Sequence, residues 1–356
     1  MNNPIKSGHL RVSLLCAVAV GLAVASMVAV SGVATAASSP RAVKASHPLK
    51  KGLKVFVIPK NLGNAYFTTA DSAKSGGAIA ALNQLGEIGT ETSGTAALPS
   101  AQIPAIAAAI SKGANILLVS ATDPVAVCPT LKGAMARGIT VVTYDADAPT
   151  CRDLFAEQAT SPLIGSVEVD IIAKELHDTG QIAVVSGAPT APNQTAWIHY
   201  MKVELKKYPH LKLVSVVYGN DDTATSTTVT EGLLSRYPDL GGIISPTTIG
   251  LPAVAAVLDT AKYRGIIKLT GVGTPLAMKK YVLDGTCPEM ILWNPANLGY
   301  LAAYAAVNFA SGDITNAKGQ SFIAGKLGKY TVGANGILLL GPPLVFTKSN
   351  IAQFHF

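Results

Sequence analysis

The sequence lacks the short motifs by which hydrolases, zinc enzymes and nucleotide-binding proteins are commonly recognised. It contains no nucleophile elbow and no complete phosphate-binding loop, and its six histidines are scattered without the local spacing of a metal site. The segment Gly271-Val272-Gly273 lacks the third glycine of a dinucleotide-binding fingerprint. We therefore expect no catalytic residues, no metal and no cofactor.

Charged residues are also scarce, at 14% of 356 residues, whereas 49% of the residues are hydrophobic. Setting aside residues 1–36 lowers the formal net charge from +7 to +5, with 26 basic and 21 acidic residues remaining. The body of the chain is nearly neutral, because four of the remaining positive charges precede residue 52. This balance argues against a nucleic-acid-binding surface. A chain of this length and apolar content is long enough for two domains with their own cores.

The first 36 residues have the order of a secretory signal peptide. Lys6 and Arg11 precede an apolar run over 14–33, and Ala34-Thr35-Ala36 fits a small-x-small cleavage site. We expect cleavage after Ala36, a leader over 37–51, and export to the periplasm, the cell surface or the medium. The apolar run is also long enough to span a bilayer, so an uncleaved anchor is the alternative.

Cysteines are few, and three of the four follow the expected cleavage site: Cys128, Cys151 and Cys287. In an exported chain two of them can pair, and we expect a Cys128–Cys151 disulfide because both flank the same βα unit. The alternative is that all three are small buried apolar side chains.

Short apolar strands alternate with helical patterns along the rest of the chain. A first series of strands over 53–58, 116–119 and 139–144 is separated by helices over about 67–85, 100–112 and 128–137. A second series has strands over 181–185, 211–218, 242–245, 267–270 and 290–293, with helices over 162–177, 193–205 and 223–236. The two series predict an α/β protein with two doubly wound parallel-sheet lobes.

Polar residues follow these strands one after another. Asp145 and Asp147 come directly after the apolar run that ends at Tyr144, and ligands of open α/β sheets bind at the carboxyl ends of the strands. A single acid there would serve equally well to cap a loop. Because polar residues follow several strands in the same way, we expect a ligand site between the lobes instead. The residues at these strand ends, most of them polar, are Lys60, Asn64, Thr122, Asp123, Asp145, Asp147, Ser186, Asn193, Gln194, Pro246, Thr247, Thr248, Gly273, Thr274 and Asn294. Aromatic residues that would wall the same site, or belong to the core instead, are Tyr66, Phe67, Trp197 and Trp293.

Five stretches of the sequence carry a family resemblance. They are VFVIPKNLGNAYF, LLVSATDPVAVCPTLKGAMARGITVVTYDADAPTCR, PTAPNQTAWI, ISPTTIGLPAVAA and GILLLGPPLVFTKSNI. From about Leu53 to Phe356 the chain resembles the sugar-type periplasmic binding proteins of ABC importers, nearest to the autoinducer-2 receptor and rhamnose-binding branch. The resemblance implies a type I periplasmic binding protein fold, with three crossover strands and a ligand clamped between the lobes. It places the lobes at 52–158 plus 295–322 and at 159–294 plus 323–356.

The resemblance also implies a ligand-binding set, which the strand-end pattern extends with Asn64 and Asn294 and the nearby aromatic residues extend with Tyr66. The autoinducer-2 receptor has an aspartate where this chain has Asn193, and an alanine where it has Thr248; Asn294 stands where an aspartate is usual. Lys60 opposite Asp145 would leave the pocket near neutral, which suits an uncharged polyhydroxy ligand. Because an amide both donates and accepts hydrogen bonds, we expect a monosaccharide or polyol in preference to autoinducer-2. The residues taken from the resemblance are Lys60, Asp145, Asn193, Gln194, Pro246 and Thr248.

The expected function is that of an exported solute-binding protein, not an enzyme. We expect a monomer that captures a small neutral sugar or sugar-like ligand and delivers it to the membrane subunits of an ABC permease. The alternative is a protein that senses autoinducer-2 or a sugar and reports to a membrane receptor. Sugar-responsive repressors share the fold, but they carry a helix-turn-helix where this chain has its signal sequence.

Overall fold

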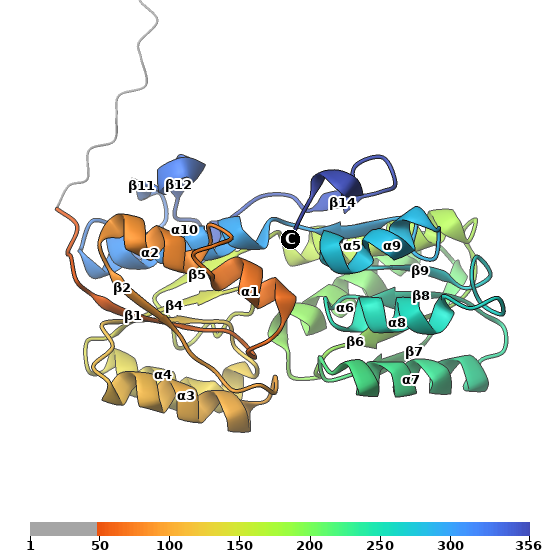
Figure 1. Ribbon diagram of the computed structural model, residues 1–356, viewed down its shortest axis with the longest axis horizontal. Coiled ribbons are helices and arrows are strands. Elements are labelled where there is room, and N and C mark those ends of the chain that lie inside the picture. The colour runs from red at the N-terminus through yellow and green to blue at the C-terminus, as the bar shows by residue number, and fades with distance from the viewer. Residues whose placement is uncertain (1–47) are drawn as a thin grey trace, which may run out of the picture. The chain divides into compact units, whose positions relative to one another are not determined.

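Two parallel sheets organise residues 48–356, the part of the chain that the computed structural model describes (Figure 1). The expected signal peptide, its cleavage site and most of the leader lie outside the described residues. Within residues 48–356, no helix is both long enough and apolar enough to cross a membrane.

The N-terminal lobe contains a six-stranded sheet in the order β2-β1-β3-β4-β5-β13, with every neighbouring pair parallel. All residues of β3 and β4 are buried, as expected for strands covered by helices on both faces. One face packs against α1, α2 and α10, and the other against α3 and α4. The bounds are β1 Lys54–Ile58, β2 Ile88–Glu91, β3 Ile116–Val119, β4 Thr140–Tyr144, β5 Leu154–Glu157, β13 Ile337–Leu339, α1 Ala65–Asp71, α2 Ala78–Leu85, α3 Pro99–Ser111, α4 Pro124–Met135 and α10 Pro295–Ala310.

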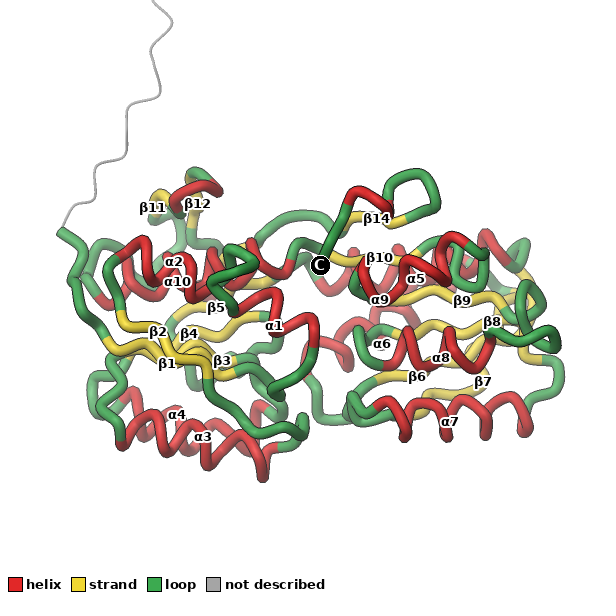
Figure 2. Tube along the Cα trace, in the orientation of Figure 1, coloured by secondary structure: helices red, strands yellow, loops and turns green. Residues whose placement is uncertain are grey.

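The C-terminal lobe contains a parallel four-stranded sheet in the order β7-β6-β8-β9. A bridge between Val272 and Ile291 joins β9 to β10, which pairs antiparallel with β14. Helices α5 and α6 pack together on one side of this sheet, and α7 and α8 pack on the other (Figure 2). The bounds are β6 Thr179–Ser186, β7 His210–Tyr218, β8 Leu240–Ser245, β9 Lys268–Gly271, β10 Met290–Leu292, β14 Leu344–Phe346, α5 Ser161–Glu175, α6 Pro192–Glu204, α7 Thr223–Arg236, α8 Gly250–Leu258 and α9 Pro275–Leu283.

Local sequence signals explain where most helices begin. A proline occupies one of the first two positions of α3, α4, α5, α6, α9 and α10. Proline is tolerated there because an N–H group in the first turn has no hydrogen-bond acceptor within the helix. Asp123 and Asp222 cap α4 and α7 by accepting hydrogen bonds from backbone N–H groups of the first turn. The smaller elements are the hairpin β11 Ser321–Ile323 and β12 Lys329–Thr331, and the 3₁₀ turns η1 Leu205–Lys207, η2 Gly325–Leu327, η3 Ala334–Gly336 and η4 Ile351–Gln353.

The chain passes between the lobes at three points: between β5 and α5, between β10 and α10, and between β13 and β14. The three crossovers implied by the resemblance are therefore present. The expected lobe boundary at 322/323 is wrong in one respect. Residues 337–339 form β13, an edge strand of the N-terminal sheet, and the chain returns to the C-terminal lobe only afterwards.

The single helix expected over 67–85 is also wrong, because the chain breaks between α1 and α2. Ser72 ends α1, and Gly76 has a φ of +77°. Gly77 lies so close to α1 that a Cβ there would be 2.1 Å from the carbonyl oxygen of Ala70. A Cβ at Gly299 of α10 would be 1.9 Å from the same oxygen. Two glycines thus enclose the end of α1. Any other residue at either position would force the backbone at Ala70 to move, because its Cβ would overlap the carbonyl oxygen.

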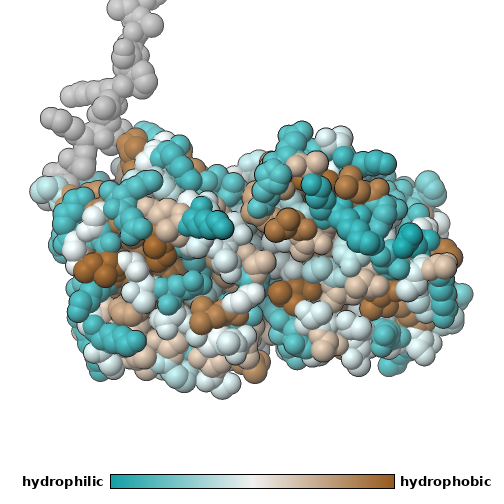
Figure 3. All heavy atoms as spheres, in the orientation of Figure 1, coloured by the Kyte–Doolittle hydropathy of each residue, from teal (hydrophilic) through white to brown (hydrophobic). Residues whose placement is uncertain are grey.

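The structure pairs Cys128 of α4 with Cys151 of the loop after β4, with Cα atoms 5.5 Å apart. Cys287 is buried and has no disulfide partner within residues 48–356, and burial raises the pKa of its thiol. On the face shown in Figure 3, hydrophobic residues lie in small groups separated by hydrophilic ones.

Candidate ligand-binding site

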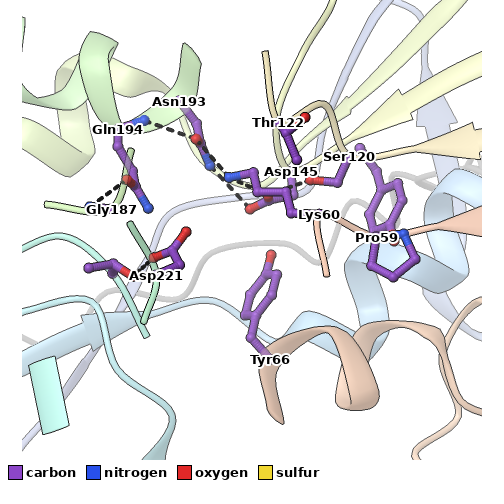
Figure 4. Close-up of polar contacts among 12 residues, drawn as sticks. Pro59, Lys60, Tyr66, Ser120, Thr122, Asp145, Gly187, Asn193, Gln194 and Asp221 are labelled. Atoms are coloured by element: carbon purple, nitrogen blue, oxygen red, sulfur yellow. Dashed lines mark hydrogen bonds and ion pairs between the residues drawn. The ribbon is translucent and has the colours of Figure 1, made fainter. Parts of the chain in front are cut away.

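A cavity lies where loops from the carboxyl ends of both sheets meet. Both lobes contribute to its wall, and Figure 4 shows the labelled polar side chains around a common space. The lining residues are Lys60, Asn64, Tyr66, Phe67, Asp145, Asn193, Gln194, Trp197, Asp221, Pro246, Thr247, Thr248, Val272 and Trp293.

A buried ion pair forms the N-terminal wall. Lys60 lies two residues beyond β1, and its Nζ is 3.3 Å from Oδ2 of Asp145, which directly follows β4. Asp145 has a φ of +61°, a conformation that aspartate tolerates better than most residues. Ser120, at the end of β3, donates a hydrogen bond of 2.7 Å to the same carboxylate oxygen. Three successive strand ends therefore build this wall.

The first turn of α6 brings two amides against the ion pair from the other lobe. Asn193 donates from Nδ2 to Asp145 at 3.3 Å, and its Oδ1 accepts from Lys60 Nζ at 3.1 Å (Figure 4). Gln194 accepts from the backbone N–H of Gly187 through Oε1 at 2.9 Å, which leaves its NH₂ group as a donor. The Asn193 amide is already engaged on both sides, so a ligand there would have to share or replace these bonds.

Aromatic rings close the cavity. Trp293 donates from Nε1 to the hydroxyl of Tyr66 at 2.8 Å, and its ring lies edge-on to that of Trp197 at 5.8 Å between centroids. Burial, followed by the nearby Asp145 carboxylate, raises the pKa of the Tyr66 hydroxyl well above its ordinary value. Tyr66 therefore keeps its proton at neutral pH.

A second buried hydrogen bond supports the aromatic wall from behind. The hydroxyl of Tyr144 donates to the carboxyl group of Asp71 at 2.9 Å, and both side chains are fully buried. Burial raises the pKa of both groups well above their ordinary values. The ring of Tyr144 also lies edge-on to Phe67, which lines the cavity.

Of the nine ligand-binding residues expected from the sequence, eight line this cavity and Asn294 does not. Asn294 caps α10 by accepting from the N–H of Asn297, and it lines a neighbouring groove together with Thr274. Asp147, two residues from Asp145, pairs with Arg152 at 2.8 Å instead of facing the cavity. Asp123 caps α4.

Two lining residues were not expected from the sequence, Asp221 and the apolar Val272. Asp221 follows β7, so the strand-end rule that selected the other residues would have found it in the run Gly219-Asn220-Asp221-Asp222. With Asp221 included, the lining carries one lysine and two aspartates, and the expected near-neutral pocket is instead formally negative by one charge. In residues 48–356, no cluster of three or more potential metal ligands is present.

Two parallel α/β lobes with a polar, aromatic-walled cavity between them define the class of two-lobed solute-binding proteins. Residues 55–314 match the family described as periplasmic binding protein domain, and the chain belongs to this family. The resemblance drawn from the sequence and the type I fold that it implied are confirmed. The family consists of ligand-binding transport proteins and is not a class of enzymes.

Known relatives agree with this assignment. An ABC transporter solute-binding protein from Clostridium phytofermentas, solved with bound L-rhamnose, is 34% identical; the alignment covers 86% of this chain and 99% of that one, with a TM-score of 0.82. LsrB from Clostridium saccharobutylicum, solved in complex with AI-2, is 26% identical with coverages of 85% and 100% and a TM-score of 0.79. A D-ribose/D-allose-binding protein of Pseudomonas aeruginosa is 25% identical over 194 residues, which span 52% of this chain and 60% of that relative.

Proposed function

We propose that this protein is an exported solute-binding protein that captures a small neutral sugar between its lobes and delivers it to an ABC permease. The observation that carries the proposal is the cavity itself, in which hydrogen-bonding groups of both lobes converge beside two tryptophans. Sugars present hydroxyl groups at their edges and apolar C–H faces, so polar side chains with aromatic walls complement them. The protein acts in this role as a monomer and without catalysis.

The ligand-binding residues of this proposal are the eight expected residues that line the cavity, together with Trp197 and Trp293. Asp145 accepts from ligand hydroxyls, Lys60 and the Gln194 amide donate, and Trp197 and Trp293 contact the C–H faces. Asn64 and Tyr66 complete the N-terminal side, and Pro246 and Thr248 the C-terminal side.

A screen of thermal stability against pentoses, deoxyhexoses, polyols and autoinducer-2 tests the proposal. A ligand present at about 100 times its Kd adds about 2.7 kcal/mol to the free energy of unfolding, which raises the melting temperature. L-Rhamnose, D-ribose and D-allose belong in the first panel because relatives are described with them. The proposal fails if no sugar or polyol raises the melting temperature and none gives heat in calorimetry.

Autoinducer-2 is the second candidate ligand, because a relative of 26% identity holds it. Asn193 and Thr248 argue for a sugar, since they add a donor and a hydroxyl where the autoinducer-2 receptor has an aspartate and an alanine. Competition between autoinducer-2 and the best sugar decides between them. Loss of sugar uptake in cells lacking the protein separates transport from sensing.

We propose export because residues 1–36 have the pattern of a signal peptide. Intact mass of the protein recovered outside the cytoplasm is expected to correspond to a chain that begins at Ala37. A mass that includes residue 1 would favour the uncleaved anchor.

A further inference from the structure

The loop between β7 and α7 carries a carboxylate to the cavity in a constrained conformation. Asn220 and Asp221 have φ values of +54° and +49°. Left-handed conformations are unfavourable for residues with a Cβ, and two in succession persist only where surrounding contacts impose them. The backbone N–H groups of Gly219 and Asn220 donate to the carbonyl oxygens of Ser186 and Gly187, at 2.7 and 3.0 Å. These bonds attach the loop to the end of β6.

The carboxylate of Asp221 is held in place by two other parts of the same lobe. The hydroxyl of Thr247, which also lines the cavity, donates to Oδ1 of Asp221. A Cβ at Gly187 would be 2.7 Å from that oxygen and 2.5 Å from Oε1 of Gln194. The absence of a Cβ at Gly187 therefore lets both side chains approach the end of β6, and Figure 4 shows them beside it.

Asp221 differs from Asp145 in its partners. Asp145 has a cation, a hydroxyl and an amide around it, whereas Asp221 forms no ion pair with any residue in the range 48–356. Lys60 is the one cationic residue among those lining the cavity, and it pairs with Asp145. Thr247 occupies Oδ1 of Asp221, and Oδ2 has no hydrogen-bond partner within the described chain. Asp221 is thus the carboxylate of the site with an open acceptor.

We propose that Asp221 is a specificity-determining residue that accepts hydrogen bonds from ligand hydroxyls on the C-terminal side of the cavity. An ionised carboxylate can only accept hydrogen bonds, so the ligand must present a donor there. With Asp145 on the opposite side, the cavity selects ligands that direct hydroxyl groups toward both lobes. The extra negative charge disfavours sugar acids. This inference deepens the proposed function and rests on it.

The test compares Asp221→Asn with Asp222→Asn by calorimetry, using the neutral sugar that binds wild type most tightly. Asparagine keeps the size of Asp221 and tolerates its positive φ, so the loop is expected to fold. Asp222 is exposed and caps α7, and asparagine caps a helix equally well. Asp221→Asn is expected to weaken binding at least about tenfold, and Asp222→Asn less than about twofold. Equal affinity of wild type and Asp221→Asn overturns the inference while the proposed function stands.

Monodeoxy analogues of the same sugar separate a ligand contact from a general disturbance. One analogue, lacking the hydroxyl that Asp221 accepts, should bind wild type at least about tenfold more weakly than the parent sugar. That analogue and the parent should then bind Asp221→Asn within about threefold of each other, because the contact is already lost. Equal penalties for every analogue in wild type and variant overturn the inference.

The predicted rejection of sugar acids is tested by measuring a uronic acid against the same two proteins. The affinity of a uronic acid relative to the neutral sugar should rise in Asp221→Asn, and an unchanged ratio contradicts the predicted rejection of sugar acids. If no neutral sugar binds wild type, the proposed function fails and the role of Asp221 fails with it.

Discussion

Lys60 Nζ lies 3.3 Å from Oδ2 of Asp145 and 3.1 Å from Oδ1 of Asn193, so one buried ammonium joins an acid of its own lobe to an amide of the other. The charged side chains are only 5% and 6% exposed. A buried ion pair is tolerated when both charges are present, and removal of one partner is costly. The contact between the lobes and the polarity of the site therefore depend on the same three side chains.

Asp145→Asn should weaken sugar binding at least about tenfold, because the ligand loses a charged acceptor. Asparagine preserves the shape and can still accept from Ser120 and Lys60, whereas alanine would leave Lys60 with only the Asn193 oxygen as an acceptor. Calorimetry measures the effect.

The matched control for that variant is Asp147→Asn, since Asp147 is a carboxylate two residues away that pairs with Arg152 outside the cavity. Its sugar affinity should stay within about twofold of wild type. Equal affinities of wild type and Asp145→Asn would show that the ligand binds elsewhere.

The Cys128–Cys151 disulfide closes a loop with a sequence separation of 23 residues. On chain-entropy grounds the Cys128→Ser/Cys151→Ser variant should lose about 3 kcal/mol of unfolding free energy, measured by denaturant titration. A protein beginning at Ala37 should show one reactive thiol, that of Cys287, when denatured without reductant. Three reactive thiols would contradict the pairing.

Ligand binding should change the intrinsic fluorescence of the protein. The sequence has two tryptophans, Trp197 and Trp293, and both line the cavity with 2% of their surface exposed. A sugar that enters the cavity alters the surroundings of both rings, so emission intensity or wavelength should shift with the same Kd as calorimetry. Asp145→Asn should require more sugar for the same change. Calorimetric binding with no spectral response in wild type would place the ligand away from the rings.

Glu168 of α5 should make the protein less stable as the pH rises. Its side chain is fully buried, neither carboxyl oxygen has a hydrogen-bond partner in the described part of the chain, and burial raises its pKa well above the ordinary value. The folded state therefore binds the proton more tightly than the unfolded state. The resulting stability is complete below the unfolded pKa of about 4.3 and is lost as the pH rises toward the folded pKa.

Glu168→Met isolates this contribution, because methionine is similarly unbranched and has no group to ionise. Asp71, whose pKa is also raised by burial, is present in both proteins, so its contribution cancels in the comparison. Between pH 5 and pH 8 the unfolding free energy of wild type should fall by at least about 1 kcal/mol relative to the variant. Urea titrations at each pH measure the difference. Parallel pH profiles would show that Glu168 is ionised or partnered in the folded protein.

Most of the central strands and the helices before residue 237 could be predicted from the sequence because their signals are local, but the strands β2, β5 and β13 and the helices α8, α9 and α10 were not expected. Apolar runs of four to six residues, prolines at helix starts and glycines at helix ends are readable one segment at a time. The rule that polar residues at strand ends face a ligand located most of the cavity. The break after α1 was missed because the apolar pattern continues through it, and the break depends on the close approach of Gly77 and Gly299 to Ala70.

Only the tertiary structure decided which of these polar residues face one another. Asp145 and Asp147 are equivalent in the sequence, but the positive φ of Asp145 turns its carboxylate to Lys60, whereas Asp147 finds Arg152. Asp221 reaches the cavity through contacts with Gly187 and Thr247, which lie 34 and 26 residues away in the chain. The physical reason is that hydrogen bonding and ion pairing depend on distance in space, and a local pattern contains no information about which strand ends are neighbours.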